Sequence, residues 1–228
     1  YTQANTIGVQ TEGNLNYFHK KNKKKQRIEV LNNWLAKPVI THCSIRINQT
    51  TLAGRKIFVY AGNMGVAQGM DIMLQLAKKL QNQQDIGFLF VGRGSEAARL
   101  AEFSHLQQLN NTLFFDEIDP DEIPDLYAQC TVGLVALDPK HKSHNIPGKF
   151  LTYMQNGLPV LANINAGNDL GKIIRNEQIG KVCETNQLDH LVTLAESLLD
   201  QIGTDIGLSA RCHQIFSRDF SVENTVRQ

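Results

Sequence analysis

The sequence predicts an α/β protein with a doubly wound, mostly parallel sheet of six strands, a Rossmann-like architecture. Two observations support this fold class. From residue 56 onward, six short apolar runs alternate with segments of helical periodicity. The apolar runs are almost continuously hydrophobic, as strands are when helices cover both faces of a parallel sheet. Each run is therefore expected to lie in the middle layer of a three-layer sandwich.

The expected elements follow one another without long gaps. The strands are predicted at residues 56–62, 86–92, 112–118, 130–137, 158–163 and 179–184. The helices are predicted at residues 69–81, 95–109, 120–130, 147–157, 168–176, 188–202 and 207–217. In the first helix, one apolar side is expected to face the sheet, formed by Met70, Met73, Leu74, Ala77 and Leu80. Pro120 and Asp121 suit a helix start, and Gly157 suits a helix end.

Composition narrows the class of protein. The chain has 228 residues and a net charge of +1, so its overall charge does not suggest a nucleic-acid partner. Its cysteines, at positions 43, 130, 183 and 212, lack metal-ligand spacing and are expected to be reduced thiols, which favours a reducing compartment. No apolar run reaches the length of a membrane span, and the first residues lack the features of a signal peptide. Because the chain opens with Tyr1, we expect that an upstream part precedes it.

The first 55 residues differ from the rest. The basic run KKNKKK at residues 20–25 is either a solvated surface segment or a contact for an anionic membrane. Pro38 and the polar INQTT at residues 47–51 indicate a linker. We therefore divide the chain into residues 1–27, a linker and lead-in at 28–55, and a main domain at 56–228.

Glycines gather where the first two strands of the main domain end. AGNMGVAQG contains Gly62 and Gly65, and VGRGS contains Gly92, Arg93 and Gly94. Glycine permits sharp turns and close approach of a ligand, and ligands of open α/β sheets bind at the carboxyl ends of the strands. The alternative is that these glycines serve only the turns. The spacing fits neither the dinucleotide fingerprint nor the P-loop.

The stretch HNIPGKFLTYMQNGLPVLA, residues 144–162, combines a helix start with a lysine. Pro147 suits the first turn, Gly148 leaves a backbone N–H accessible, and Lys149 adds a mobile positive charge. These residues suggest a cradle for a diphosphate. An ordinary capped helix with an exposed lysine is the competing interpretation.

Taken together, these motifs resemble the C-terminal domain of a GT-B glycosyltransferase, most closely the retaining family 4 enzymes of bacterial polysaccharide biosynthesis. EVLNNWL resembles the interdomain linker, and FVYAGNMGVAQGMDIMLQLAKKL resembles the first strand, glycine loop and helix. FLFVGRGSE, DLYAQCTVGLVAL and IPGKFLTYMQNGLPVLA match later segments in the right order. The resemblance covers about residues 28–228. TIGVQTEGNLNYF resembles the end of the N-terminal domain, which would make residues 1–27 a remnant of that domain.

The resemblance implies roles for individual residues. His144 and Lys149 would be catalytic. The donor-binding set would be Gly62, Asn63, Met64, Gly65, Gln68, Gly92, Arg93, Gly94, Asp116, Ile118, Pro147, Gly148 and Thr152. The sequence departs from the family at His144 and Thr152, where the family has two glutamates, and at Asn63 and Gln68, where it usually has Arg and Lys. No metal and no cofactor are implied.

The resulting expectation is an enzyme that transfers sugar from a nucleoside-diphosphate sugar to a glycan or lipid-linked acceptor. It would be cytoplasmic, with a peripheral contact at the inner face of the plasma membrane, and this chain alone would be inactive. Two alternatives remain open. One is a module that binds nucleotide sugars without turnover, and the other is a flavodoxin-like or epimerase-like protein that shares only the fold.

Overall fold

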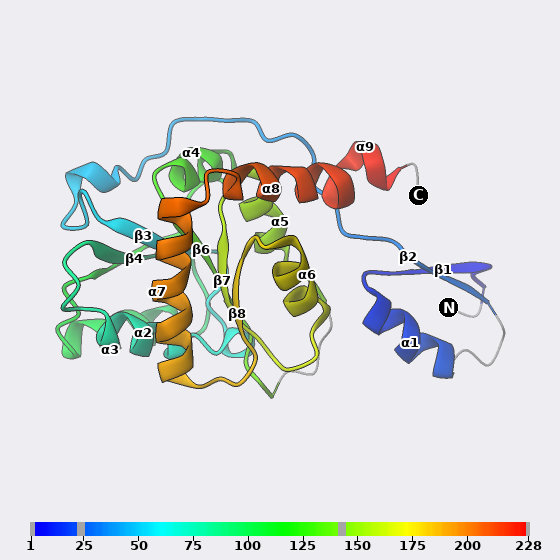
Figure 1. Cartoon of the computed structure of the whole chain (residues 1–228), viewed down its shortest axis with the longest axis horizontal. Coiled ribbons are helices and arrows are strands. Elements are labelled where there is room, and N and C mark those ends of the chain that lie inside the picture. The colour runs from blue at the N-terminus through cyan, green and yellow to red at the C-terminus, as the bar shows by residue number, and fades with distance from the viewer. Residues whose placement is uncertain (1–2, 22–25, 141–144, 227–228) are drawn as a thin grey trace.

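A parallel sheet of six strands forms the centre of the protein (Figure 1). The computed structural model describes residues 3–21, 26–140 and 145–226. The strand order is β5-β4-β3-β6-β7-β8, and every neighbouring pair is parallel. The strands are β3 (Lys56–Ala61), β4 (Ile86–Val91), β5 (Thr112–Phe115), β6 (Val132–Ala136), β7 (Val160–Asn163) and β8 (Gly180–Cys183). This is the doubly wound order, so the predicted fold class is confirmed.

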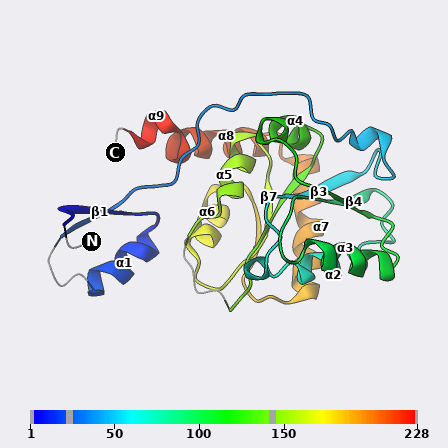
Figure 2. The same ribbon diagram turned by 180° about the vertical axis from the view of Figure 1, so that it is seen from behind.

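Helices cover both faces of the sheet, and each face has its own apolar core (Figures 1 and 2). One layer consists of α2 (Asp71–Lys79), α3 (Ala97–Leu106) and α7 (Leu188–Thr204). The other consists of α4 (Ile123–Ala128), α5 (Gly148–Gln155), α6 (Asp169–Glu177) and α8 (Leu208–Ile215). A π-helical segment (Phe216–Phe220) and α9 (Val222–Thr225) follow α8. The apolar side predicted for the first helix is confirmed, because all five of its residues are buried.

The alternation of side chains along β3 shows how the two cores are divided. Ile57 and Val59 belong to the core under α4, α5, α6 and α8, and Phe58 and Tyr60 belong to the core under α2, α3 and α7. Successive side chains of a strand point to opposite faces, so an apolar run without polar alternation fills both cores.

The N-terminal residues form a small unit that the sequence did not predict. β1 (Thr6–Val9) pairs in parallel with β2 (Arg27–Val30), and α1 (Glu12–Lys21) connects them. Ile7, Val9 and Ile28 are buried beneath this helix. The unit lies beside the main body and reaches α6, where the Gly13 amide donates to Asp169 Oδ2 at 2.7 Å (Figure 1).

Much of the segment between β2 and β3 packs against the main body. After β2 the chain runs along the side of the main body formed by α8 and α4, in both views (Figures 1 and 2). The lead-in differs from the expected linker, because Ile45, Ile47 and Leu52 are buried in the main core and residues Ile47–Gln49 form a 3-10 helix. Gln129 of α4's C-cap fastens it by accepting from the Ile47 amide at 3.0 Å.

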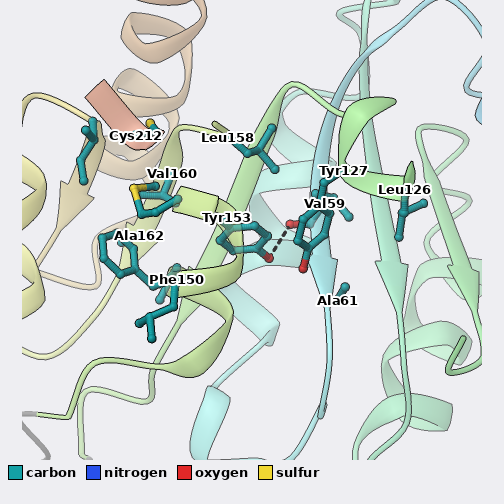
Figure 3. Packing of buried hydrophobic residues seen from close by; sticks show 14 of the residues in the cluster. Val59, Ala61, Leu126, Tyr127, Phe150, Tyr153, Leu158, Val160, Ala162 and Cys212 are labelled. Carbon is teal, nitrogen blue, oxygen red and sulfur yellow. Dashed lines mark hydrogen bonds between the residues drawn. The ribbon is translucent and has the colours of Figure 1, made fainter. Parts of the chain in front are cut away.

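Tyr153 of α5 points toward Val59 of β3 in the buried core (Figure 3). β3 and β6 pair at only two positions, Phe58 with Val132 and Val59 with Gly133. The Tyr153 hydroxyl lies 3.1 Å from the carbonyl oxygens of both Val59 and Leu134. The hydroxyl therefore joins β3 and β6 next to the positions at which these two strands pair.

Candidate active site

A cavity of about 430 Å³ opens at the carboxyl ends of β3 and β4. Strand ends, α4, α5 and the linker all contribute to its walls. The lining residues are Leu35, Ala36, Pro38, Ala61, Gly62, Val91, Gly92, Glu117, Ile118, Pro120, Ile123, Pro124, Tyr127, Lys149, Thr152 and Gln155. The walls are mainly apolar, with a few polar groups, as in sites for small organic ligands. Of the predicted site residues, Gly62, Gly92, Ile118, Lys149 and Thr152 meet here.

Lys149 lies at the start of α5 and is more enclosed than the sequence suggested. Its Nζ is 4.4 Å from the centroid of the Tyr60 ring, and its side chain is only partly exposed, unlike the exposed lysine of the competing interpretation. Burial lowers the pKa of Lys149 to about 8, because a desolvated ammonium is disfavoured. A phosphate next to Lys149 would favour the ammonium form and raise the pKa of this lysine, so anion binding would itself promote the charged state.

Tyr60 also supports the first glycine loop. Its hydroxyl donates to the Asn63 carbonyl at 2.7 Å, and the ring is fully buried. Burial raises the pKa of Tyr60, so the hydroxyl stays protonated. Gly62 follows with a φ of +134°, and a Cβ placed there would meet only Lys149, at 3.7 Å from its Cε. Tyr60 therefore supports the loop and the lysine together.

The two glycine loops pack directly on each other. Gly62 N donates to Val91 O at 2.9 Å, and Met64 N donates to Arg93 O at 2.7 Å. Gly92 has a φ of +136°, and a Cβ there would lie 2.2 Å from Gly62 O. A Cβ at Gly94 would lie 2.3 Å from Met64 O. For Gly92 and Gly94, the interpretation that glycine serves the backbone is supported, and their ligand contact stays a prediction.

The other predicted residues of the first glycine loop mainly stabilise the loop. Gln68 Oε1 accepts from Gly65 N at 3.0 Å and from Asn63 Nδ2 at 3.4 Å, which holds the short 3-10 helix Val66–Gln68 in place. The Met64 side chain is buried in the core and does not line the cavity. Donor contacts of these four residues remain predictions.

Charged residues lie at the rim, where β4 and β5 end. Arg93 Nε contacts Glu117 Oε2 at 2.8 Å, and both side chains are exposed. Glu117 lines the cavity, whereas Arg93 and the exposed Asp116 do not. Such an exposed pair contributes little to stability and leaves Arg93 able to exchange its partner for a phosphate.

α5 presents Thr152 and Gln155 to the cavity from one side, three residues apart. Pro147 occupies the N-cap with φ −62°, and Gly148 opens the helix. The first amides of a helix have no partner within it and favour an anion. Neither Pro147 nor Gly148 lines the cavity, although Lys149 beside them does. His144 lies outside the described residues.

Sequence reasoning missed several lining residues. Glu117, Tyr127, Gln155 and the linker residue Pro38 contribute to the walls. The i, i+3 relation on α5 would have pointed from Thr152 to Gln155. No local signal could place the linker against the cavity, because its fastening joins distant segments, such as Ala36 and Gln155, which are 119 positions apart.

Among the described residues, no group of three or more His, Cys, Asp or Glu side chains has metal-binding geometry. Cys43, Cys183 and Cys212 are buried free thiols, and Cys130 is a half-buried one. Within the part of the chain that is described, no helix combines the length and apolar character that a bilayer span requires.

Solved structures that share this doubly wound fold include GT-B glycosyltransferases, so the fold of the chain is that of a GT-B domain. HepE from Anabaena, solved in complex with UDP and glucose, has this fold with a TM-score of 0.73 over 99% of the chain. At 16% identity, and with 61% of HepE covered, the similarity concerns the fold alone.

The chain belongs to the family described as glycosyl transferases group 1, which matches residues 55–201, more than half of its length. It is 25% identical over 174 residues to the probable glycosyltransferase WbjE of Pseudomonas aeruginosa, covering 75% of the chain and 43% of WbjE. It is 28% identical over 119 residues to the putative colanic acid biosynthesis glycosyl transferase WcaI of Escherichia coli, covering 52% of the chain and 29% of WcaI. The chain thus spans less than half the length of these two curated relatives.

Proposed function

We propose that this chain is the donor-nucleotide half of a retaining, family 4 type glycosyltransferase. The enzyme would transfer sugar from a nucleoside-diphosphate sugar to a glycan or lipid-linked acceptor in bacterial polysaccharide biosynthesis. The observation that carries this proposal is Lys149, whose amine lies beside Gly62 at a helix start, inside a cavity at the switch point of the sheet. A cation in the first turn of a helix suits a diphosphate leaving group.

The chemistry asked of the protein is positioning and charge stabilisation. As the bond from the sugar to the diphosphate breaks, negative charge grows on the diphosphate. Lys149 and the amides at Gly148 would stabilise that charge, and the apolar walls near Ile118 and Tyr127 would hold the base. Lys149 would provide this stabilisation without a metal or a cofactor.

The relatives support the proposal. WbjE and WcaI are named as glycosyltransferases, and the name of WcaI refers to colanic acid biosynthesis. HepE was solved with UDP and glucose, which fits a nucleotide-sugar donor. These names favour an enzyme over a module that binds nucleotide sugars without turnover, although Thr152 still stands where the family has a glutamate.

Two further parts of the proposal concern the complete enzyme. Family 4 enzymes work in a cleft between two domains, so this chain alone would not turn over a donor, because most of the positioning advantage would be absent. The acceptor would be reached at the inner face of the cytoplasmic membrane, with the basic run at residues 20–25 near anionic lipid. Of that run, residues 22–25 lie outside the described residues.

Ligand-detected NMR of this chain against UDP, GDP and their sugars tests the binding function. Lys149→Ala should weaken diphosphate binding by about 1–3 kcal/mol, the range of a charge-assisted contact. Lys78→Ala, on the exposed end of α2, is the matched control and should bind like the native chain. If Lys149→Ala binds UDP and GDP as tightly as the native chain does, the assignment of the diphosphate site is refuted.

A further inference from the structure

One wall of the cavity belongs to neither the sheet nor a helix. It is the segment of residues 35–41, here called the strap, and Leu35, Ala36 and Pro38 of the strap line the cavity. The opposing walls come from strand ends, α4 and α5. The strap leads from the β1–α1–β2 unit to the lead-in of the main domain, so the donor cavity and the connection between the two units share a surface.

The strap is fastened at its two ends. Leu35 N donates to Phe220 O at 3.0 Å, and Thr41 N donates to Asp121 O at 3.0 Å. Between Ala36 and Thr41, no backbone hydrogen bond is formed with any described residue, and residues 37–40 are exposed. A segment with so few buried contacts opens locally at low cost.

Between these ends, the side chain of Gln155 forms a hydrogen bond with the strap. Its Nε2 donates to Ala36 O at 2.7 Å, and the same side chain lines the cavity. It lies in the last turn of α5, the helix whose first turn carries Lys149. One side chain therefore contacts both the strap and the space where a nucleotide would lie.

We propose that Gln155 is a positioning residue of the nucleotide site, which holds the strap in place as a wall of the cavity, and that a bound nucleotide orders the strap. This inference rests on the proposed function, since it assigns a nucleoside diphosphate to the cavity. A ligand that contacts the closed strap stabilises it by mass action, because the open strap offers it fewer contacts. Donor binding would then also restrain the path from the β1–α1–β2 unit to the main domain.

The test compares Gln155→Met with Gln84→Met. Methionine keeps the length and helix preference of Gln155 but cannot donate to Ala36 O. Gln84 is exposed in the turn before β4, at the opposite edge of the sheet, and serves as the control. UDP and GDP affinities are measured by titration calorimetry, and hydrogen exchange is followed in peptides that cover residues 31–42.

In the native chain, UDP or GDP should slow exchange in the strap peptides. Gln155→Met should speed their exchange and raise the Kd about 2- to 10-fold, the range expected for one hydrogen bond, mainly through faster release. Gln84→Met should match the native chain. A second variant, Pro38→Gly, loosens the strap without touching α5 and should act in the same direction.

Each contrary outcome has a distinct meaning. If the native chain binds neither nucleotide, the proposed function itself is overturned, and the strap inference with it. If the native chain binds but the strap peptides gain no protection, or if Gln155→Met binds like Gln84→Met, only the strap inference is overturned. Faster exchange in Gln155→Met without any change in Kd would show a purely structural hydrogen bond and would also overturn it.

Discussion

Lys149 shows how much a residue's chemistry depends on what lies next to it. A lysine at a helix start is ordinarily exposed and carries a full charge. Here it lies over the ring of Tyr60, and burial lowers its pKa to about 8. Its charge therefore changes within a pH range that is easily reached in experiments.

Diphosphate binding should depend on pH through this group. The ammonium strengthens binding, and in the free chain the ammonium is lost as the pH rises through about 8. Affinity for UDP or GDP should be level below that pH and fall above it, by up to about tenfold per pH unit. Calorimetric titrations from pH 6.5 to 9.5 would measure this, and proton uptake on binding should appear near pH 8.

Lys149→Arg is the informative control, because arginine stays charged throughout this range. Its binding should show no decline between pH 8 and 9.5. A native chain whose affinity is flat across the same range would contradict the role of Lys149 as the titrating group.

At the scale of elements, the packing of α5 against β6 depends on one aromatic ring and the glycine facing it. Tyr153 enters between β3 and β6, and a Cβ on Gly133 would lie 2.6 Å from the ring carbons of Tyr153. Gly133 is therefore needed for space, since β6 is fully buried and the ring cannot move outward.

Gly133→Ala should lower the free energy of unfolding by about 1–3 kcal/mol, the usual cost of overpacking a core. Urea unfolding followed by circular dichroism would measure it. Gly203→Ala is the matched control, because Gly203 is exposed in α7 and no atom lies within 4 Å of its added Cβ. That control should be neutral or gain up to about 1 kcal/mol from helix propensity. If the two variants are equally stable, the Tyr153 ring can shift to accommodate the added Cβ, and the prediction is contradicted.

On the scale of the whole molecule, Asp169 joins the N-terminal unit to the main body. Its Oδ2 accepts from Gly13 N at 2.7 Å, and Lys172 Nζ contacts its Oδ1 at 3.1 Å. Although burial acts in the opposite direction, hydrogen bonds from Gly13, Thr11 and Lys172 hold the pKa of Asp169 below its usual value. A second contact, from Asn14 Nδ2 to Asn145 Oδ1 at 3.0 Å, lies beside it.

Asp169→Ala should loosen the contact between α1 and α6. Hydrogen exchange in peptides that cover residues 11–18 should become roughly tenfold faster, as expected when a hydrogen bond to a charged group is lost. Because the folded pKa of Asp169 is depressed, the contact is stabilised above its unfolded pKa, and this stabilisation is lost as the pH falls through the folded value. The difference between the native chain and the variant should therefore shrink toward strongly acidic pH.

Asp189→Ala, which removes an exposed carboxylate at the start of α7, should leave exchange in residues 11–18 unchanged. If Asp169→Ala also leaves it unchanged, the N-terminal unit is held by other contacts.

The sequence alone determined the order and type of the main elements, because the signals for them are local. Apolar runs, helical periodicity and turn residues act over a few positions, so β3, the glycine loops and the helix start at Pro147 were predictable. The β1–α1–β2 unit was missed, since its strands, TIGV and RIEV, are not continuous apolar runs.

Only the tertiary structure decided which residues of those elements contact one another. The burial of Lys149 by Tyr60, the packing of Gly92 on Gly62 and the hydrogen bond of Gln155 to the linker each join residues that are 30 to 119 positions apart. The free energy of such contacts depends on distance, desolvation and packing, which exist only once the chain has folded. A local pattern can place a lysine, a glycine or a glutamine on an element, but the partner that determines its pKa, its space or its role comes from elsewhere in the chain.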